Sequence, residues 1–402
     1  MANLLWGKVY YKDQFAGYLR QEPGDSASFA YDASYIEKGW PQLSHTLPVR
    51  QEAYSNNSGL HPFFDNLVSE GWLEQAQARL LGRREASRFE LLLAFGFDCA
   101  GAVSIVDPDP HKLSSHMLDP EDPKEMAVMK GRASLSGVQP KLAAVFDDKS
   151  FRPARYGELS THIAKFPSPG HPGLIENEYL TTLAVATLLP DDAISHLAVG
   201  EIAGVDETAL IIKRFDRSNG ERIHFEEFNQ LLNRRSRAKY DGAYKDMASF
   251  INETKGCIPA QAYVLYKRIL AGILLGNTDM HLKNFAMFES EAGYILTPSY
   301  DQVAANLYNY KTLALSISGA SDLPLGGLKA SNIVQLGEEF NLRPPAIMMA
   351  IEQLSGQISE AKDKISDAEI GTKSIKNQLI NNLEKRWNGT FISIGQYLSQ
   401  KP

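Results

Sequence analysis

The stretch GNTDMHLKNFAMF (residues 276–288) crowds acidic, basic and amide side chains between two apolar segments. In it, Asp279 lies five residues before Asn284, and Asp301 follows two short predicted strands. Protein kinases place a catalytic aspartate five residues before a metal-binding asparagine, with a second metal-binding aspartate farther along the chain. Because Mg²⁺ prefers hard oxygen ligands, Asn284 and Asp301 are candidate ligands. The pattern predicts phosphoryl transfer, with Asp279 orienting the attacking hydroxyl.

A lysine that binds nucleotide phosphates is expected upstream, on a strand of a β-rich region. Two lysines end predicted strands there: Lys165 ends STHIAK and Lys213 ends ALIIK. A kinase lysine is usually held by a glutamate from the following helix, and Glu178 in ENEYL is so placed for Lys165. Lys213 is followed by RFDR and a turn, which is typical of a strand-end lysine that reaches solvent. We therefore prefer Lys165 and keep Lys213 as the alternative.

The segment SLSGVQPK (residues 134–141) lies where a phosphate loop is expected. It has one glycine and matches neither the GxxxxGK[ST] nor the GxGxxG pattern, so by itself it predicts only a turn. Its two serines, Ser134 and Ser136, suggest a second role. A hydroxyl in a phosphate loop is well placed for phosphorylation, and the added charge would be repelled by nucleotide phosphates.

Periodicity and turn residues predict the elements that position these groups. A β-hairpin is expected over 4–20 and two helices over 62–95, and the proline-rich, acidic segment 105–125 predicts an exposed connector. Strands then dominate around one helix, and helices dominate after about residue 225. The fold class is α+β, with an N-terminal α+β subdomain, a small β-rich lobe and a larger all-helical C-terminal lobe. The predicted domains are residues 1–108, 125–224 and 225–402.

Composition is that of an ordinary globular protein of enzyme size: 402 residues, 44% hydrophobic and 22% charged. The net charge of −7 opposes a protein that coats nucleic acid by itself. The basic run NRRSRAK (233–239) is the local exception, read as a solvated face or a contact with phosphate groups of a partner. Cys99 and Cys257 are too few for a disulfide framework. We find no signal peptide and no apolar stretch long enough to span a bilayer, and expect a cytoplasmic protein.

In their order and spacing, these motifs resemble the HipA family of serine/threonine-kinase toxins from bacterial toxin–antitoxin modules. The resemblance covers roughly residues 4–370, and its most specific part is the TDMHLKNF…YD block. It implies a two-lobed protein-kinase-like fold that uses ATP and Mg²⁺. The segments that carry it are SLSGVQPKLAAVF, THIAKFP, NEYL, KRFDR, GNTDMHLKNFAMF and LTPSYDQVA, after the N-terminal segments FAYDASYIEKGWPQLSHTLPVR and PFFDNLVSEGW.

Carried over by position, the resemblance makes Asp279 the catalytic base and assigns metal binding to Asn284 and Asp301. It makes Ser134 the serine on which such kinases phosphorylate themselves, although Ser136 competes for that role. Ordinary protein kinases carry a lysine two residues after the catalytic aspartate, whereas this chain has His281 there. The nucleotide would be contacted by Lys165, by Ser136, Gly137 and Val138 of the loop, by the hinge residues Glu226 and Phe228, and by His281, with Glu178 and Lys283 in support.

The family also implies partners: a HipB-like helix-turn-helix antitoxin, DNA only through the complex with it, and no membrane. The implied substrate is a protein such as an aminoacyl-tRNA synthetase, whose phosphorylation would stop translation. Two other readings stay open. One is a small-molecule kinase with the same Asp-to-Asn spacing, which the N-terminal subdomain and the two-serine loop oppose. The other is a catalytically silent repressor or binding subunit, which the intact set of Asp279, Asn284, Asp301 and Lys165 opposes.

Overall fold

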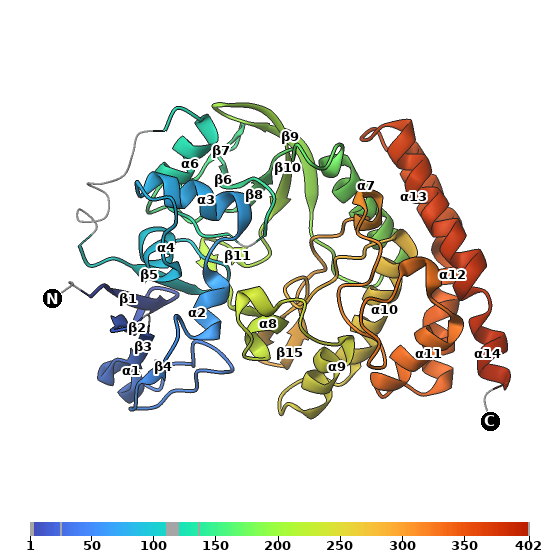
Figure 1. Cartoon of the computed structure of the whole chain (residues 1–402), viewed down its shortest axis with the longest axis horizontal. Helices are drawn as coiled ribbons and strands as arrows, with labels where there is room; N and C mark the ends of the chain where they lie inside the picture. Colours follow the sequence, from blue (N-terminus) through green and yellow to red (C-terminus); the bar gives the residue numbers. More distant parts are fainter. Residues whose placement is uncertain (1–3, 25, 110–119, 136, 401–402) are drawn as a thin grey trace. The chain divides into compact units, whose positions relative to one another are not determined.

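The computed structural model describes residues 4–24, 26–109, 120–135 and 137–400 (Figure 1). Ser136, one of the two candidate phosphorylation sites, lies outside the described residues. The chain forms two compact units, each continuous in space but not in sequence. The first comprises Met1–Ser168 and Leu197–Ala238, and the second comprises Pro169–His196 and Lys239–Pro402.

The first unit opens with an antiparallel sheet in the order β4-β3-β2-β1-β5. Strands β1 and β2 pair antiparallel from Trp6 opposite Arg20 to Tyr11 opposite Gln14, with one bulge at Val9/Tyr10, so the predicted hairpin is confirmed. Val9, Leu19 and Phe29 line the buried face. The strands are β1 (Trp6–Tyr11), β2 (Gln14–Glu22), β3 (Ser26–Tyr31), β4 (Tyr54–Asn56) and β5 (Val103–Val106).

Four short helices accompany this sheet, and three of them, α2, α3 and α4, lie within the stretch 62–95, where two helices were predicted. Helix α2 has proline at its first position, where the missing N–H leaves no helical bond unmade. Helix α4 begins with a capping box formed by Ser87 and Glu90. The helices are α1 (Ala33–Glu37), α2 (Pro62–Leu67), α3 (Gly71–Leu80) and α4 (Arg88–Phe95).

The β-rich part of the first unit is a closed barrel in the order β10-β8-β6-β7-β9. Its pairs are antiparallel except for β7 with β9. The strands predicted from LSGVQPKLAAVF, STHIAKF and GEIAGVDETALIIK are thereby confirmed. They are β6 (Lys141–Phe146), β8 (His162–Lys165), β9 (Leu197–Ile202) and β10 (Val205–Lys213), whereas β7 (Phe151–Pro153) is a short strand that was not predicted. Around them lie α6 (Pro123–Gly131), β11 (Arg217–Ser218), β12 (Glu221–Arg222), β13 (Phe225–Glu227), α8 (Phe228–Leu231) and the 3-10 helix η1 (Ser236–Ala238).

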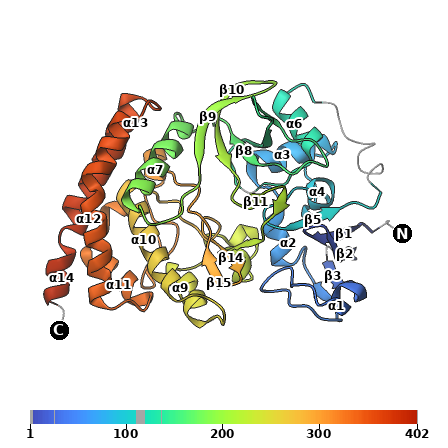
Figure 2. The ribbon, with the colours of Figure 1, turned by 180° about the vertical axis from the view of Figure 1, so that it is seen from behind.

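The second unit is mainly helical, with one hairpin of β14 (Ala286–Ser290) and β15 (Gly293–Leu296). The lobe that was called all-helical therefore contains the two strands that NFAMF and GYILTP predict. Helices α12 and α13 lie side by side in both views (Figure 2). The helices are α7 (Leu174–Leu188), α9 (Tyr244–Glu253), α10 (Ala260–Leu275), α11 (Ala330–Glu339), α12 (Pro344–Asp367), α13 (Lys373–Arg386) and α14 (Ile394–Gln400), with the short turns η2 (Ala305–Tyr308), η3 (Leu325–Gly327) and η4 (Trp387–Phe391).

Helix α7 was predicted as the single helix of the β-rich lobe, and its position corrects that prediction. It packs against α12, α10 and α13 of the second unit. The physical reason is its composition, since Leu180, Val185 and Leu188 are each no more than 1% exposed and need apolar helical surfaces around them. In the part of the chain that the structure describes, no helix is both long and apolar enough to cross a membrane.

Candidate active site

The predicted catalytic loop starts where α10 ends, at Gly276. This glycine has a φ of +86°, and a Cβ on it would lie 2.3 Å from Oδ1 of Asn306. Both facts require glycine. The N–H of Asn277 closes the helix by donating to the carbonyl of Gly272 at 2.8 Å. The side-chain oxygen of Asn277 then accepts from the N–H of Asp279 at 3.1 Å, which holds the candidate base directly after the helix.

Hydrogen bonds within the loop account for its crowded polar residues. The N–H of His281 donates to the carbonyl of Asp279 at 2.8 Å and to Oδ1 of Asn284 at 3.0 Å. The N–H of Asn284 donates to the carbonyl of His281 at 3.0 Å, and the N–H of Lys283 donates to Nδ1 of His281 at 3.3 Å. The His281 and Lys283 side chains are buried, so both support the loop from within. Polar groups in this buried segment are thus satisfied by one another.

The structure brings the two candidate metal ligands together. Nδ2 of Asn284 donates to Oδ2 of Asp301 at 2.9 Å. Asp301 has a left-handed φ of +57°, a conformation that aspartate and asparagine tolerate better than most residues. The hydroxyl of Tyr300 donates to the carbonyl of Lys283 at 2.8 Å, tying the turn that carries Asp301 to the catalytic loop.

This pair of ligands fits Mg²⁺ better than a metal that needs a full protein cage. Among the described residues, no group of three or more His, Cys, Asp or Glu side chains could hold a metal ion. Magnesium is commonly held by one or two protein oxygen ligands, with substrate phosphates and water completing its octahedron. One carboxylate and one amide oxygen match that pattern, and they disfavour a structural zinc site.

Asp279 lies in an environment that disfavours its charge. Burial, together with the nearby charge of Asp301, raises the pKa of its carboxyl to about 6, although a hydrogen bond from Tyr240 and the charge of Lys239 act in the opposite direction. The Tyr240 hydroxyl donates to Oδ1 of Asp279 at 2.9 Å, and the Tyr240 ring packs edge-on against His281 with centroids 4.9 Å apart. A general base works best with a pKa near the working pH, which this environment favours.

Tyr240 was missed because it follows the basic run 233–239, which was assigned to solvent or to a partner. Its hydroxyl donates to the carboxylate of Asp279, and its ring packs against His281. Tyr240→Phe keeps the ring and removes the hydrogen bond, so the pKa of Asp279 should rise and kcat should fall by roughly five- to tenfold near neutral pH.

The pH dependence of kcat measures this effect, and its acid limb should move to higher pH in Tyr240→Phe. Tyr263→Phe is the matched control, because the hydroxyl of Tyr263 donates instead to Gln353, at 3.3 Å. Superimposable profiles for Tyr240→Phe and the unmodified chain would contradict a role for the hydroxyl.

The two candidate nucleotide lysines differ in exposure. Lys165 ends β8 and is only 7% exposed, whereas Lys213 at the end of β10 is exposed, as expected for a strand-end lysine. Lys165 pairs in register with Lys141 of β6, which is 5% exposed. Residues directly opposite one another on antiparallel strands share a face of the sheet, so two buried ammonium groups face the same way. Their combined charge suits a polyphosphate.

Lys141 is a further residue that the sequence reasoning did not assign. It is the last residue of the loop segment 134–141, which was the available signal. A Cβ on Gly137 would lie 2.4 Å from Nζ of Lys141, and the φ of Gly137 is +97°. Glycine is therefore needed at this position for the ammonium group to approach the loop backbone. Val138, the next residue of the loop, is 66% exposed.

The hinge residues hold their side chains inside the first unit. The carboxylate of Glu226 accepts from the hydroxyl of Ser44 at 2.5 Å and from the N–H of His45 at 2.7 Å. Phe228 is fully buried. Any contact of these two residues with a nucleotide would therefore be made by their main chain. Glu178 is buried on α7 in the second unit, and its pairing with Lys165 stays a prediction.

Ser134 is buried, with 2% of its surface exposed. Its hydroxyl donates to the carbonyl of Leu67 at 2.7 Å and lies 3.0 Å from the hydroxyl of Ser69. In this conformation the hydroxyl is occupied and covered, so phosphorylation of Ser134 requires the loop to move.

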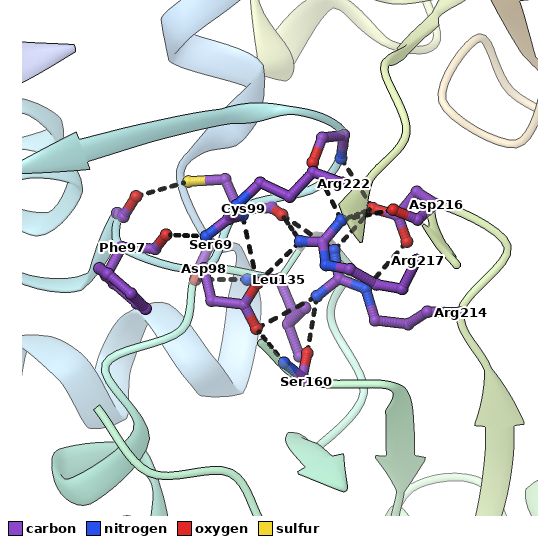
Figure 3. A network of polar contacts seen from close by, with 12 residues as sticks. Ser69, Phe97, Asp98, Cys99, Leu135, Ser160, Arg214, Asp216, Arg217 and Arg222 are labelled. Carbon is purple, nitrogen blue, oxygen red and sulfur yellow. Dashed lines mark hydrogen bonds and ion pairs between the residues drawn. The ribbon is translucent and has the colours of Figure 1, made fainter. Parts of the chain in front are cut away.

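A buried charge network joins the N-terminal sheet module to the barrel (Figure 3). Asp98 bonds Arg217 at 2.7 Å and lies 3.4 Å from both Arg214 and Arg222, while Asp216 bonds Arg214 at 2.6 Å. Arg214 and Arg217 also donate to the carbonyl of Cys99 at 2.9 and 2.7 Å. Oδ2 of Asp98 accepts from the N–H of Ser160, just before β8, and the carbonyl of Asp98 accepts from the N–H of Ser134.

Comparison with known proteins gives the class and then the family. Residues 7–106 match the HipA N-terminal domain and residues 133–362 match the HipA-like C-terminal domain. The protein Y4dM of Sinorhizobium fredii is 32% identical over 72% of this chain and 75% of its own length. The serine/threonine-protein kinase toxin HipA of Shewanella oneidensis is 30% identical over 74% of this chain and 75% of its own.

The same architecture occurs in a solved structure of Shewanella oneidensis HipA with HipB and operator DNA. The likeness has a TM-score of 0.75 and 22% identity, and it covers 97% of this chain and 99% of the other. By its architecture, the chain is thus an α+β protein with the HipA fold. It belongs to the HipA family, as its motifs suggested.

Proposed function

We propose that this chain is an ATP- and Mg²⁺-dependent serine/threonine protein kinase that acts as the toxin of a toxin–antitoxin module. The observation that carries the proposal is the geometry of the catalytic loop. It holds a half-buried aspartate of raised pKa, Asp279, on the same short segment as Asn284, whose side chain bonds Asp301. A kinase active site needs these three groups and a phosphate-binding lysine, and Lys165 is buried in a suitable strand.

Each residue has one task in the reaction. Bound Mg²⁺–ATP supplies the phosphoryl group and neutralises part of its charge. Asp279 accepts a hydrogen bond from the substrate hydroxyl, orients its oxygen and takes its proton, while Tyr240 fixes the carboxylate from the other side. Asn284 and Asp301 would hold the metal, and Lys165 and Lys141 would bind phosphate oxygens.

Family membership supports a proposal for the partners. The relative from Shewanella oneidensis is named as a serine/threonine-protein kinase toxin, and a solved HipA of that organism is in complex with HipB and operator DNA. By analogy, we propose a HipB-like antitoxin for this chain and DNA contact through that complex. The proposed substrate is a protein, with an aminoacyl-tRNA synthetase as the first candidate.

The test is incubation of the purified chain with ATP and Mg²⁺, followed by mass spectrometry. Phosphate should appear on Ser134 or Ser136, and chelation of the metal should abolish it. Phosphoproteomics after induction in bacteria, compared with an Asp279 variant, identifies the substrate. Transfer to a sugar or antibiotic without any phosphoprotein would instead support the small-molecule kinase, and ATP that is neither bound nor consumed would support the silent subunit.

A further inference from the structure

The connection between α2 and α3, residues 67–72, lies against the phosphate loop. We call it the clamp segment. The hydroxyl of Ser69 lies 3.0 Å from the hydroxyl of Ser134 and accepts from the N–H of Leu135 at 3.3 Å. The N–H of Trp72 donates to the carbonyl of Val138 at 3.3 Å. Together with the bond from Ser134 to the carbonyl of Leu67, the clamp segment bonds both ends of the stretch 134–138.

Gly71 gives the closest contact between the two segments. A Cβ at Gly71 would lie 2.6 Å from Cα of Val138 and 2.9 Å from its carbonyl oxygen. Those atoms belong to the backbone or lie next to it, so they can give way only if the loop itself moves. The close approach and the φ of +60° at Gly71 make glycine the residue that fits there.

The clamp segment is itself held firmly. Ser69 is fully buried, and the hydroxyl of Ser236 donates to the carboxylate of Glu70. On α2, just before the segment, Asp65 accepts from the N–H of Ser236 at 2.8 Å and forms an ion pair with Arg88 at 2.5 Å. A firmly held segment that bonds a loop at both ends restricts the conformations of that loop.

We propose that the clamp segment positions the phosphate loop for ATP and keeps the hydroxyl of Ser134 from being phosphorylated. This inference rests on the proposed kinase function and gives the N-terminal module a part in it. Phosphorylation then requires the clamp to open first. In the transfer, Oγ of Ser134 bonds to the γ-phosphorus of ATP as the bond to the β,γ-bridging oxygen breaks. ADP leaves, and the hydroxyl proton passes to Asp279 of the acting molecule.

The alternative is that residues 67–72 only fill space between the N-terminal sheet and the barrel. In that case a change at Gly71 would alter stability and leave the loop and ATP binding as they are. The two explanations therefore predict different effects of Gly71→Ala on the mobility of the loop. Hydrogen exchange of the loop amides measures that mobility directly.

The experiment compares Gly71→Ala with Gly39→Ala in the full chain. Gly39 has nearly the same φ, +64°, but no atom lies within 4 Å of a Cβ placed there, so this control has the backbone strain without the contact. In Gly71→Ala, the amides of Ser134, Leu135, Gly137 and Val138 should exchange at least about tenfold faster without nucleotide, and KM for ATP should rise roughly tenfold or more. Gly39→Ala should match the unmodified chain in both measurements.

A second variant, Ser69→Ala, removes the hydrogen bonds without adding bulk. Because one lost hydrogen bond shifts an opening equilibrium about fivefold, phosphorylation of Ser134 should become roughly fivefold faster. If Gly71→Ala and Gly39→Ala show the same hydrogen exchange of the loop amides and the same KM for ATP, the clamp proposal is overturned. If Gly71→Ala does not fold, unchanged loop exchange in Ser69→Ala overturns it instead. Should the unmodified chain bind no ATP, the kinase proposal fails, while the exchange measurement still decides on the clamp.

Discussion

Asp279→Asn is expected to reduce phosphoryl transfer by about 10²–10⁴-fold, the usual contribution of a general base, and to relieve any growth arrest that the chain causes. Asparagine keeps the size of the side chain, and its amide oxygen can still accept the hydrogen bond from Tyr240. It cannot take a proton from a substrate hydroxyl. The loss should therefore appear in kcat and leave KM for ATP almost unchanged.

The same substitution should stabilise the metal-free protein near neutral pH. Burial raises the pKa of Asp279 to about 6, above its value of about 4 in an unfolded chain, so ionisation is harder in the folded state. The ionised carboxylate therefore destabilises the fold above about pH 6 and has no such effect below about pH 4. Asp279→Asn should gain about 1–3 kcal/mol of unfolding free energy at pH 8, and the gain should vanish at pH 4.

Thermal unfolding at several pH values and initial rates of phosphoryl transfer provide the two measurements. Asp363→Asn, an exposed aspartate on α12 of the same unit, is the control and should change neither. Loss of activity together with loss of stability would mean that Asp279 supports the fold and not the reaction. Full activity in Asp279→Asn would remove it as the base.

The catalytic loop could be anticipated from the sequence because its parts are local. Helix α10, the loop and the β14–β15 hairpin follow one another in the chain, so the spacing of Asp279, Asn284 and Asp301 reflects their geometry. Lys141 and Tyr240 could not be found in this way. Lys141 was missed because its position depends on the register that places it opposite Lys165 on another strand. Tyr240 was missed because it contacts Asp279, which is 39 residues away in the chain.

The sequence also did not indicate which distant segments pack against one another. Helix α7 was placed correctly along the chain but with the wrong neighbours, because its apolar surface does not indicate which helices cover it. In the sequence, Asp98 only interrupts the apolar run LLLAFGFDCAGAVSIV, and nothing near it in the chain indicates an ion pair. Its guanidinium partners are more than 100 residues away, on Arg214 directly after β10, Arg217 of β11 and Arg222 of β12.

Asp98 is the centre of the network in Figure 3 and is fully surrounded by protein, with 1% of its surface exposed. Burial alone would raise the pKa of its carboxyl, but the guanidinium groups of Arg214, Arg217 and Arg222 together hold the pKa below its ordinary value. Asp216 is the second carboxylate of the network, and the same balance lowers its pKa to about 2. Two carboxylates thus offset three guanidinium groups in the protein interior.

Asp98→Asn is expected to destabilise the protein by about 3–5 kcal/mol, since removing one partner of a buried ion pair leaves the other charges uncompensated. A lowered carboxyl pKa stabilises the fold above the unfolded value of about 4, and this stabilisation is lost as pH falls through the folded value. The loss of unfolding free energy in Asp98→Asn, relative to the unmodified chain, should therefore be largest at neutral pH. It should become smaller below about pH 4, as measured by urea or thermal unfolding. Asp206→Asn, exposed on β10, should unfold like the unmodified chain. A deficit that is the same at pH 3 and pH 7 would show that shape, and not charge, makes Asp98 necessary.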